Sequence, residues 1–131
     1  MDQHIKSPCC GDIWLCSLAD NKNSVQSGFR PVFIVSNNKN NTYSTTLNVI
    51  PITSKMNKRR LPVHVELWDY AKYGLQKPST MMIEQISTIS VEALDRRIGS
   101  VSDSETLSRI GRAMMVQFPV FDPVITNYEK N

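Results

Sequence analysis

Residue patterns that support several common kinds of catalysis are missing from this 131-residue sequence. It has two histidines, His4 in a polar N-terminal segment and His64 in an alternating run, so acid–base catalysis by a histidine pair is not expected. It has no glycine-rich phosphate loop, no Ser-His-Asp order typical of a nucleophilic triad, and no carboxylate cluster suited to magnesium. The sequence therefore predicts neither a bound metal nor an organic cofactor.

Cysteine is scarce, and long apolar runs are absent. Cys9, Cys10 and Cys16 are an odd number, and the residues before them do not have the pattern of a signal peptide, which favours a reducing, cytoplasmic compartment. Their spacing matches no usual zinc pattern, and His4 is a poor fourth ligand, so a zinc site is disfavoured. No segment approaches the roughly 20 apolar residues that span a bilayer, so no membrane association is expected.

The composition is that of a globular domain, with 40% hydrophobic and 21% charged residues. A chain of this length fits one domain and can bury roughly two-thirds of the surface that it exposes when unfolded. Fifteen lysines and arginines against twelve acidic residues give a formal net charge of +3. This balance permits an anionic partner without requiring one.

The chain shows no repeat or linker, and we expect a loose arm over residues 1–10, one domain over residues 11–118 and a tail over residues 119–131. Alternating apolar, β-branched and aromatic residues predict five short strands. These are Gly11–Leu18, Pro31–Ser36, Thr45–Thr53, Pro62–Trp68 and Ser79–Ile89. Asn37–Asn41 is expected to be a turn, and Ser90–Arg97 one or two helical turns. Short strands with a closing helix predict an α+β fold, mainly β, built as a bent barrel.

The closing helix is expected after Ser102. Ser102 and Glu105 have the spacing of a capping box, with Ser102 at the N-cap, and Pro119 ends the helix. An apolar stripe at helical spacing is interpreted as core rather than as a docking surface. The stripe consists of Leu107, Ile110, Met114 and Phe118.

Arg30 stands at a boundary between a polar loop and a predicted strand. The loop Ala19–Gly28 is rich in turn formers and longer than a hairpin needs, which is typical of functional loops. Pro31 fixes the backbone directly after Arg30, so that the guanidinium can face a cleft while its base is held. Composition alone favours the plainer alternative, a surface arginine in a salt bridge.

Five blocks of the sequence, in order, resemble motifs of one known family. They are Gly11–Trp14, Gly28–Val32, Ile50–Ser54, Leu61–Val65 and Ile83–Ile89. The second block has the pattern Gly-x-Arg-Pro-Val of the MazF/PemK toxins of bacterial toxin–antitoxin systems. The similarity extends from about Gly11 to Phe118, and five ordered blocks make it specific where one would be weak.

The resemblance implies an SH3-like barrel of the CcdB/MazF type with a C-terminal helix, assembled as a homodimer. It implies a toxin that is a metal-independent, sequence-specific endoribonuclease of single-stranded mRNA. Attack by a ribose 2′-OH on the adjoining phosphate would leave 2′,3′-cyclic phosphate and 5′-OH ends. By position, Arg30 matches the family's catalytic arginine and Thr53 its catalytic threonine, and both can donate hydrogen bonds to a phosphoryl group.

Seven further residues are predicted to bind RNA from their positions in or beside these blocks. They are Ser24, Gln26, Gly28, Phe29, Ser54, Lys55 and Gln85. Phe29 can stack on a base, whereas Trp14 and Trp68 are expected in the core. The resemblance also implies a cognate antitoxin with an acidic C-terminal segment, and contact with operator DNA only through the antitoxin complex.

Two departures from the family pattern keep other functions open. Val25 stands where many relatives have Glu, and Ser87 where many have Arg. These departures put the rate of cleavage and the preference for particular RNA bases in doubt. The basic run Lys55–Arg60 is either an RNA track or a solvated loop. The alternatives are a barrel toxin that binds gyrase without chemistry, and an inactive binding module. Trapped gyrase–DNA complexes would support the first, and growth arrest that survives Arg30→Ala would support either.

Overall fold

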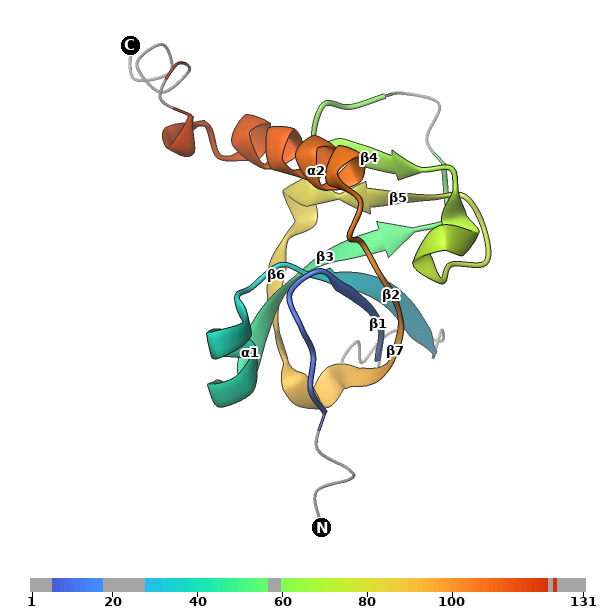
Figure 1. The fold of residues 1–131 in the computed structure, drawn as a ribbon, viewed down its shortest axis with the longest axis vertical. Coiled ribbons are helices and arrows are strands. Elements are labelled where there is room, and N and C mark those ends of the chain that lie inside the picture. The colour runs from blue at the N-terminus through green and yellow to red at the C-terminus, as the bar shows by residue number, and fades with distance from the viewer. Residues whose placement is uncertain (1–5, 18–27, 57–59, 123, 125–131) are drawn as a thin grey trace, which may run out of the picture.

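The computed structural model describes residues 6–17, 28–56, 60–122 and 124. Figure 1 shows these residues as a strongly bent antiparallel sheet with a long helix across one end. The strands are β1 (Asp12–Ser17), β2 (Phe29–Ile34), β3 (Thr46–Thr53), β4 (His64–Leu67), β5 (Ser79–Met82), β6 (Ser87–Ser90) and β7 (Leu94–Ser100). The helices are α1 (Asn38–Tyr43) and α2 (Ser104–Gln117), with 3₁₀ helices η1 (Tyr70–Tyr73), η2 (Ile83–Gln85), η3 (Val91–Ala93) and η4 (Pro119–Phe121). The expected α+β fold, mainly β with a C-terminal helix, is confirmed.

Strand β3 connects the two halves of the sheet, whose order is β4-β5-β3-β2-β1-β7. One edge of β3 pairs with β2, and the other pairs first with β6 along Thr46–Val49 and then with β5 along Ile52–Thr53. Pro51 lies between these two partners. Proline within a sheet is usually confined to an edge or a bulge, and Pro51 occupies the gap where β3 changes partner, so its missing N–H disrupts neither the β6 ladder nor the β5 ladder.

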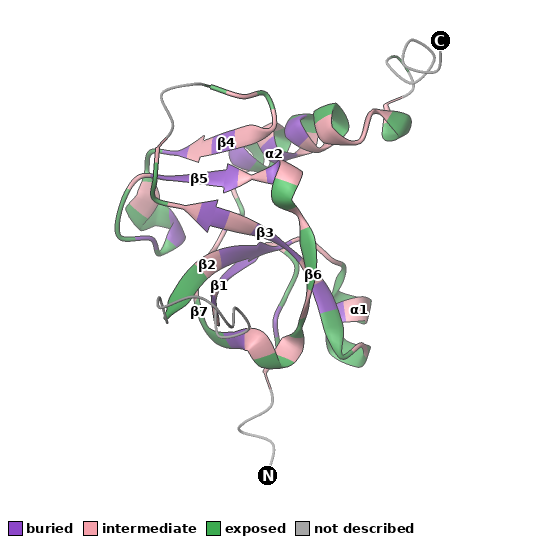
Figure 2. Ribbon diagram, turned by 180° about the vertical axis from the view of Figure 1, so that it is seen from behind, coloured by how far each residue is buried: buried purple, intermediate pink, exposed green. Residues whose placement is uncertain are grey.

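The buried apolar side chains form two clusters, and neighbouring residues of one strand alternate between them. Figure 2 shows the buried positions concentrated in β1, β3 and β5. The larger cluster, which includes α2, consists of Ile13, Phe33, Ile50, Ile52, Val65, Leu67, Tyr73, Leu75, Met81, Ile83, Val101, Ile110 and Ala113. The smaller consists of Trp14, Cys16, Val32, Ile34, Leu47, Val49 and Leu94. Burial of both faces explains why the β1 segment is apolar at successive positions.

Two predicted elements after residue 79 were wrong. The single strand Ser79–Ile89 is two strands, because β5 pairs with the second half of β3 and β6 with the first half, and η2 carries the chain between them. The helical turns expected over Ser90–Arg97 reduce to η3, and Leu94–Ser100 is the strand β7 on the open edge of β1. Pairing with β1 and burial of Leu94 outweigh the local helical tendency.

The turn expected at Asn37–Asn41 is instead the short helix α1. The side chain of Asn37 caps it by accepting a hydrogen bond from the Asn40 backbone N–H at 2.8 Å. Asn41 is buried and donates to the Ser36 carbonyl oxygen at 2.8 Å, which fixes the helix on the sheet. Asparagine commonly favours turns, whereas here it supplies a cap and a buried anchor.

Helix α2 begins one residue later than predicted, with Asp103 rather than Ser102 as its N-cap. The Asp103 carboxylate accepts hydrogen bonds from the Thr106 backbone N–H and from the Tyr73 hydroxyl, both at 3.0 Å. The cap therefore also joins α2 to η1. No helix in the described part of the chain combines the length and apolar character that crossing a membrane requires.

The expected apolar stripe of α2 is only partly core. Ile110 is buried, but Leu107 is 41% exposed, and Thr106 and Ala113 complete the buried face. The packed face is therefore rotated from the predicted one. Arg109 donates to the carbonyl oxygen of Glu66 in β4 at 2.9 Å, which fixes the helix against that strand.

Replacing Asp103 with alanine is expected to lower the free energy of unfolding at pH 7 by about 1–2 kcal/mol, because the N-cap is lost. The hydrogen bonds from Thr106 hold the pKa of the Asp103 carboxyl well below its usual range. The carboxylate's contribution is therefore complete above the unfolded pKa, near 4, and is lost as the pH falls through the folded pKa. Urea unfolding should show the gap between wild type and Asp103→Ala narrowing below about pH 4.

Asp103→Asn is the matched control, since asparagine keeps a capping oxygen without the charge. It should be less destabilising than Asp103→Ala at pH 7. A gap between wild type and Asp103→Ala that stays constant from pH 7 to pH 2 would contradict this account.

Candidate functional site

The register of β2 and β3 brings Arg30 and Thr53 to the same place. The ladder pairs Ile34 with Val49, Phe33 with Ile50, and Val32 with Pro51, where it ends. Continuing that register by two residues sets Arg30 opposite Thr53, on the same face of the two strands. The ladder ends beside Pro31 and Pro51, neither of which has a backbone N–H to donate, and the strands separate there.

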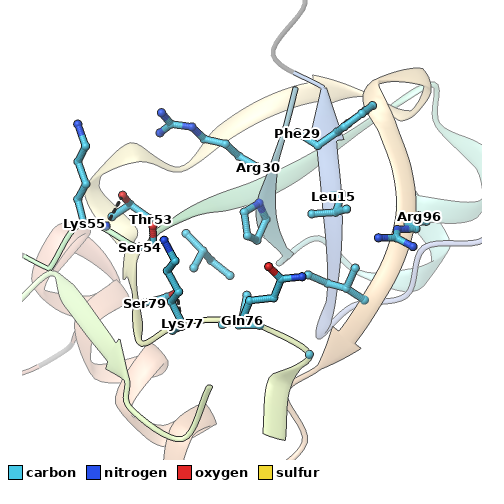
Figure 3. Close-up of a pocket in the computed structure, with 15 residues that line it drawn as sticks. Leu15, Phe29, Arg30, Thr53, Ser54, Lys55, Gln76, Lys77, Ser79 and Arg96 are labelled. Atoms are coloured by element: carbon cyan, nitrogen blue, oxygen red, sulfur yellow. Dashed lines mark hydrogen bonds between the residues drawn. The ribbon is translucent and has the colours of Figure 1, made fainter. Parts of the chain in front are cut away.

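A cavity of about 600 Å³ occupies the space where β2 and β3 separate. Figure 3 shows Arg30 and Lys55 reaching over the side of this cavity on which Thr53 lies, with Arg96 on the opposite side. The other walls come from β1, β7 and the segment after η1. The lining residues are Leu15, Phe29, Arg30, Pro31, Ile52, Thr53, Ser54, Lys55, Gly74, Leu75, Gln76, Lys77, Ser79, Arg96 and Ile98.

The charge of the described cavity lining is entirely positive. Its four charged side chains are Arg30, Lys55, Lys77 and Arg96. No acidic residue lines the described walls, and none of the four cations forms a salt bridge within the described residues. A concave surface with unpaired cations attracts a polyanion and holds its phosphates.

The Thr53 hydroxyl is oriented by the backbone that follows it. Its oxygen accepts a hydrogen bond from the Lys55 N–H at 3.1 Å, as the dashed line in Figure 3 marks. The hydroxyl hydrogen stays available as a donor toward the cavity. Arg30 and Thr53 together can offer several donors to one tetrahedral anion.

Two glycines, of which Gly74 lines the cavity, let the backbone at the end of η1 touch that of β7. Gly74 follows η1 with a φ of +79°, and a Cβ on it would overlap the carbonyl oxygen of Ile98. A Cβ on Gly99 would overlap the carbonyl oxygen of Tyr73. Only glycine allows this approach, which fixes the segment carrying Gln76 and Lys77 beside β7.

Five of the nine predicted site residues line this cavity: Phe29, Arg30, Thr53, Ser54 and Lys55. Gly28 is exposed beside Phe29 but does not line it, and Gln85 is exposed in η2, away from the lining. Ser24 and Gln26 lie outside the described residues, as does Val25. The catalytic and binding roles assigned to these residues stay predictions.

The predictions for the aromatic side chains were only partly correct. Phe29 is 53% exposed at the cavity, where a base can reach it, and Trp14 is buried as expected, donating to Asp12 at 3.2 Å. The predicted burial of Trp68 was wrong, since this side chain is 58% exposed. Val65 and Leu67 face the core, so alternation turns Trp68 outward with Glu66.

The basic run after Thr53 does not act as one unit. Lys55 lines the cavity, whereas Arg60 pairs with Glu66 at 3.6 Å. Lys58 and Arg59 lie outside the described residues. His64 bonds Glu84 at 2.9 Å and does not line the cavity, so it is a structural hydrogen-bonder rather than a partner of Arg30.

Sequence reasoning missed four polar residues of the cavity: Gln76, Lys77, Ser79 and Arg96. Gln76 and Lys77 follow the turn at Gly74, and their relation to β7 depends on the backbone contact between distant glycines. Arg96 was expected in a helical turn, so its side chain had no predicted direction. Along β7, Leu94 is buried and the next three residues, Asp95, Arg96 and Arg97, are all exposed, so no alternation of apolar and polar residues marked this strand in the sequence.

Comparisons with known proteins agree with one another. Residues 10–118 match the family described as PemK-like, MazF-like toxins of type II toxin–antitoxin systems. The endoribonuclease MazF of Staphylococcus saprophyticus is 39% identical over 95 residues, which are 72% of this chain and 78% of the relative. The Mycobacterium tuberculosis toxin MazF-mt6 is 26% identical with a TM-score of 0.68, covering 82% of this chain and 96% of its own.

A second solved structure shares the fold. It is an endoribonuclease from a mycobacterial species in complex with its cognate antitoxin, 22% identical with a TM-score of 0.68. The match covers 88% of this chain and 99% of that one.

Gly99→Ala is expected to destabilise the protein by about 1–3 kcal/mol, because the added methyl group forces the Tyr73 carbonyl away from β7. Thermal unfolding measures the loss. Gly111→Ala is the control, since a Cβ there meets nothing within 4 Å in its own chain and the substitution removes a helix-interior glycine, so the melting temperature should stay or rise. Because Gly111 also lines an apolar groove on α2, the melting temperatures are compared at a protein concentration low enough to keep the chains apart. Equal stability of Gly99→Ala and wild type would refute the proposed close contact.

Proposed function

Because the chain belongs to the family of PemK-like, MazF-like toxins of type II toxin–antitoxin systems, we propose that it cuts single-stranded RNA in the cationic cavity between β2 and β3. It is an endoribonuclease of the MazF type. The observation that carries the proposal is the meeting of Arg30 and Thr53 at one cavity whose described walls hold four unpaired cations and no carboxylate. Single-stranded mRNA, cut at a specific sequence, is the proposed substrate.

The substrate supplies the nucleophile. A ribose 2′-oxygen bonds to the adjoining phosphorus while the bond from phosphorus to the 5′-oxygen of the next nucleotide breaks. The 2′-OH gives up its proton, and the departing 5′-oxygen takes one up. The products are a 2′,3′-cyclic phosphate and a 5′-OH end, and DNA, which lacks the 2′-OH, is resistant.

Arg30 and Thr53 stabilise the charge that gathers on the phosphoryl oxygens. The Arg30 guanidinium presents a planar fork of donors, and the Thr53 hydroxyl adds one more. An arginine keeps its proton at neutral pH, so Arg30 stabilises charge rather than acting as the general base. These cations carry out the neutralisation for which many phosphoryl-transfer enzymes use magnesium, so the reaction proceeds without a metal.

The biological partner is an antitoxin made with the toxin in the cytoplasm. A segment rich in carboxylates complements the unpaired cations of the cavity and competes there with RNA. The mycobacterial neighbour solved with its cognate antitoxin supports such a partner. Operator DNA is reached only through that complex. RNA cleavage that persists with saturating antitoxin would contradict the competition.

Arg30→Ala and Thr53→Ala are each expected to reduce the cleavage rate by about 10² to 10³, the usual loss for a preorganised transition-state donor. Single-turnover cleavage of a long mixed RNA in EDTA measures the rate, and mapping of the ends gives the products and the target sequence. The wild type should cut RNA in EDTA and leave its 2′-deoxy counterpart intact.

Lys39→Ala is the charge-matched control, because Lys39 is exposed on α1 and does not line the cavity. Its rate should equal that of the wild type. RNA left intact by the wild type, activity only with added metal, or 5′-phosphate ends would each contradict the proposed chemistry. Growth arrest by Arg30→Ala equal to that of wild type would favour a binding toxin.

The proposed homodimer has a suitable surface on the C-terminal half of α2 and on η4, which follows it. An apolar groove of about 380 Å³ lies there. It is lined by Gly111, Met114, Met115, Phe118 and Phe121. Phe121 is 75% exposed, and apolar surface gathered in this way commonly marks an association site.

Light scattering should give the mass of two chains for the wild type and of one chain for Met115→Glu, which places a charge in the groove. Tyr43→Glu on α1 changes an exposed residue outside the groove and should stay dimeric. A monomeric wild type would exclude the dimer, and a dimeric Met115→Glu would exclude this surface.

A further inference from the structure

We propose that Arg96 binds a second phosphate of the RNA, next to the one being cleaved, and so positions the strand across the cavity. The inference rests on the proposed function and adds a binding subsite that none of the five family-like blocks contains. Arg96 is a positioning residue, because it acts on a phosphate that does not react.

The sheet places Arg96 at a fixed separation from Arg30. Arg30 is on β2 and Arg96 on β7, and both strands pair with β1, which lies between them. Neighbouring strands lie about 4.8 Å apart, so the two backbones are separated by roughly 10 Å. Figure 3 shows the two arginines on opposite sides of the cavity with Phe29 and Leu15 between them.

Because Arg30 and Arg96 lie on opposite sides of the cavity, their guanidinium groups can meet two phosphates of one strand rather than the same one. A nucleotide bound between the arginines has its base near the exposed ring of Phe29, and Leu15 supplies an apolar floor. A phosphate at each end of that nucleotide then meets one guanidinium. The Thr53 hydroxyl lies at the Arg30 end, so the reaction belongs to that end.

The contrast between Arg96 and Arg97 indicates that Arg96 is free to bind a ligand. Arg97 donates to the buried carboxylate of Asp12 at 3.1 Å and therefore has a structural partner. Arg96 is exposed, lines the cavity and has no carboxylate partner among the described residues. Its neighbour Asp95 forms no salt bridge with it.

The backbone that carries Arg96 is held firmly enough to set a register. Leu94 is buried in the smaller core cluster and pairs with Cys16 of β1. Gly99 is fixed against the Tyr73 carbonyl by the close backbone contact. A guanidinium on a strand anchored at both sides of the residue binds with less loss of freedom than one on a loop.

Arg96→Ala is expected to raise KM for cleavage about tenfold and to leave kcat within about twofold, since a charge-assisted bond to a non-reacting phosphate contributes to binding alone. Arg30→Ala, by contrast, should lower kcat. Arg96→Lys keeps the charge without the planar fork and should recover part of the affinity. Lys39→Ala should change neither constant.

Binding is measured separately from cleavage. The probe is mixed-sequence RNA with 2′-O-methyl on every ribose, which lacks the attacking hydroxyl, titrated by fluorescence anisotropy at several KCl concentrations. Arg96→Ala should reduce the slope of log K against log [KCl] by about 0.7, the value for one phosphate of a single strand. Single methylphosphonate substitutions around the mapped cleavage point should weaken binding of wild type at the reacting phosphate and at one neighbour, and Arg96→Ala should lose the sensitivity at that neighbour.

Failure of the inference differs from failure of the proposed function. The subsite would be overturned if Arg96→Ala had the KM and the salt slope of wild type, or if methylphosphonate substitution still weakened its binding at the neighbouring phosphate. Cleavage by the wild type, and with it the proposed function, would stand in either case. If instead the wild type binds RNA, Arg96→Ala reduces the salt slope and no cleavage occurs, the subsite is supported and the nuclease activity is not.

Discussion

The end of the β2–β3 ladder at Val32 and Pro51 is the feature on which the site depends. Two strands in one register keep opposite residues on the same face, and the absence of further pairing beyond that point separates them. Arg30 and Thr53 therefore share a cavity without filling it. Had the ladder continued, the same two residues would form an ordinary cross-strand pair on a closed sheet.

Local sequence determined part of this arrangement. The apolar alternation located β1, β2, β3 and β4 to within a few residues, and the Arg-Pro pair indicated where a cation meets a rigid backbone. Motif resemblance, not periodicity, singled out Thr53. Both residues lie in segments that alternation predicted as strands or strand boundaries, and the resemblance supplied their candidate roles.

The remaining features depend on contacts between distant segments. Strand β7 exists because the edge of β1 is available to it, and that availability cannot be read from Leu94–Ser100 itself. Helix α1 depends on a side-chain cap from Asn37 and on burial of Asn41. The separate roles of Arg96 and Arg97 follow from the position of Asp12, a residue 84 and 85 places earlier in the chain.

Gly74, after η1, and Gly99, in β7, face each other and limit which substitutions the sequence can accept at these positions. Each lacks a side chain because the other segment's backbone occupies that space, so enlarging one cannot be offset by shrinking its partner, which is already minimal. Compensation would have to come from moving a whole segment. The two positions are thus coupled through geometry, and a sequence that keeps this backbone arrangement must have glycine at both of them.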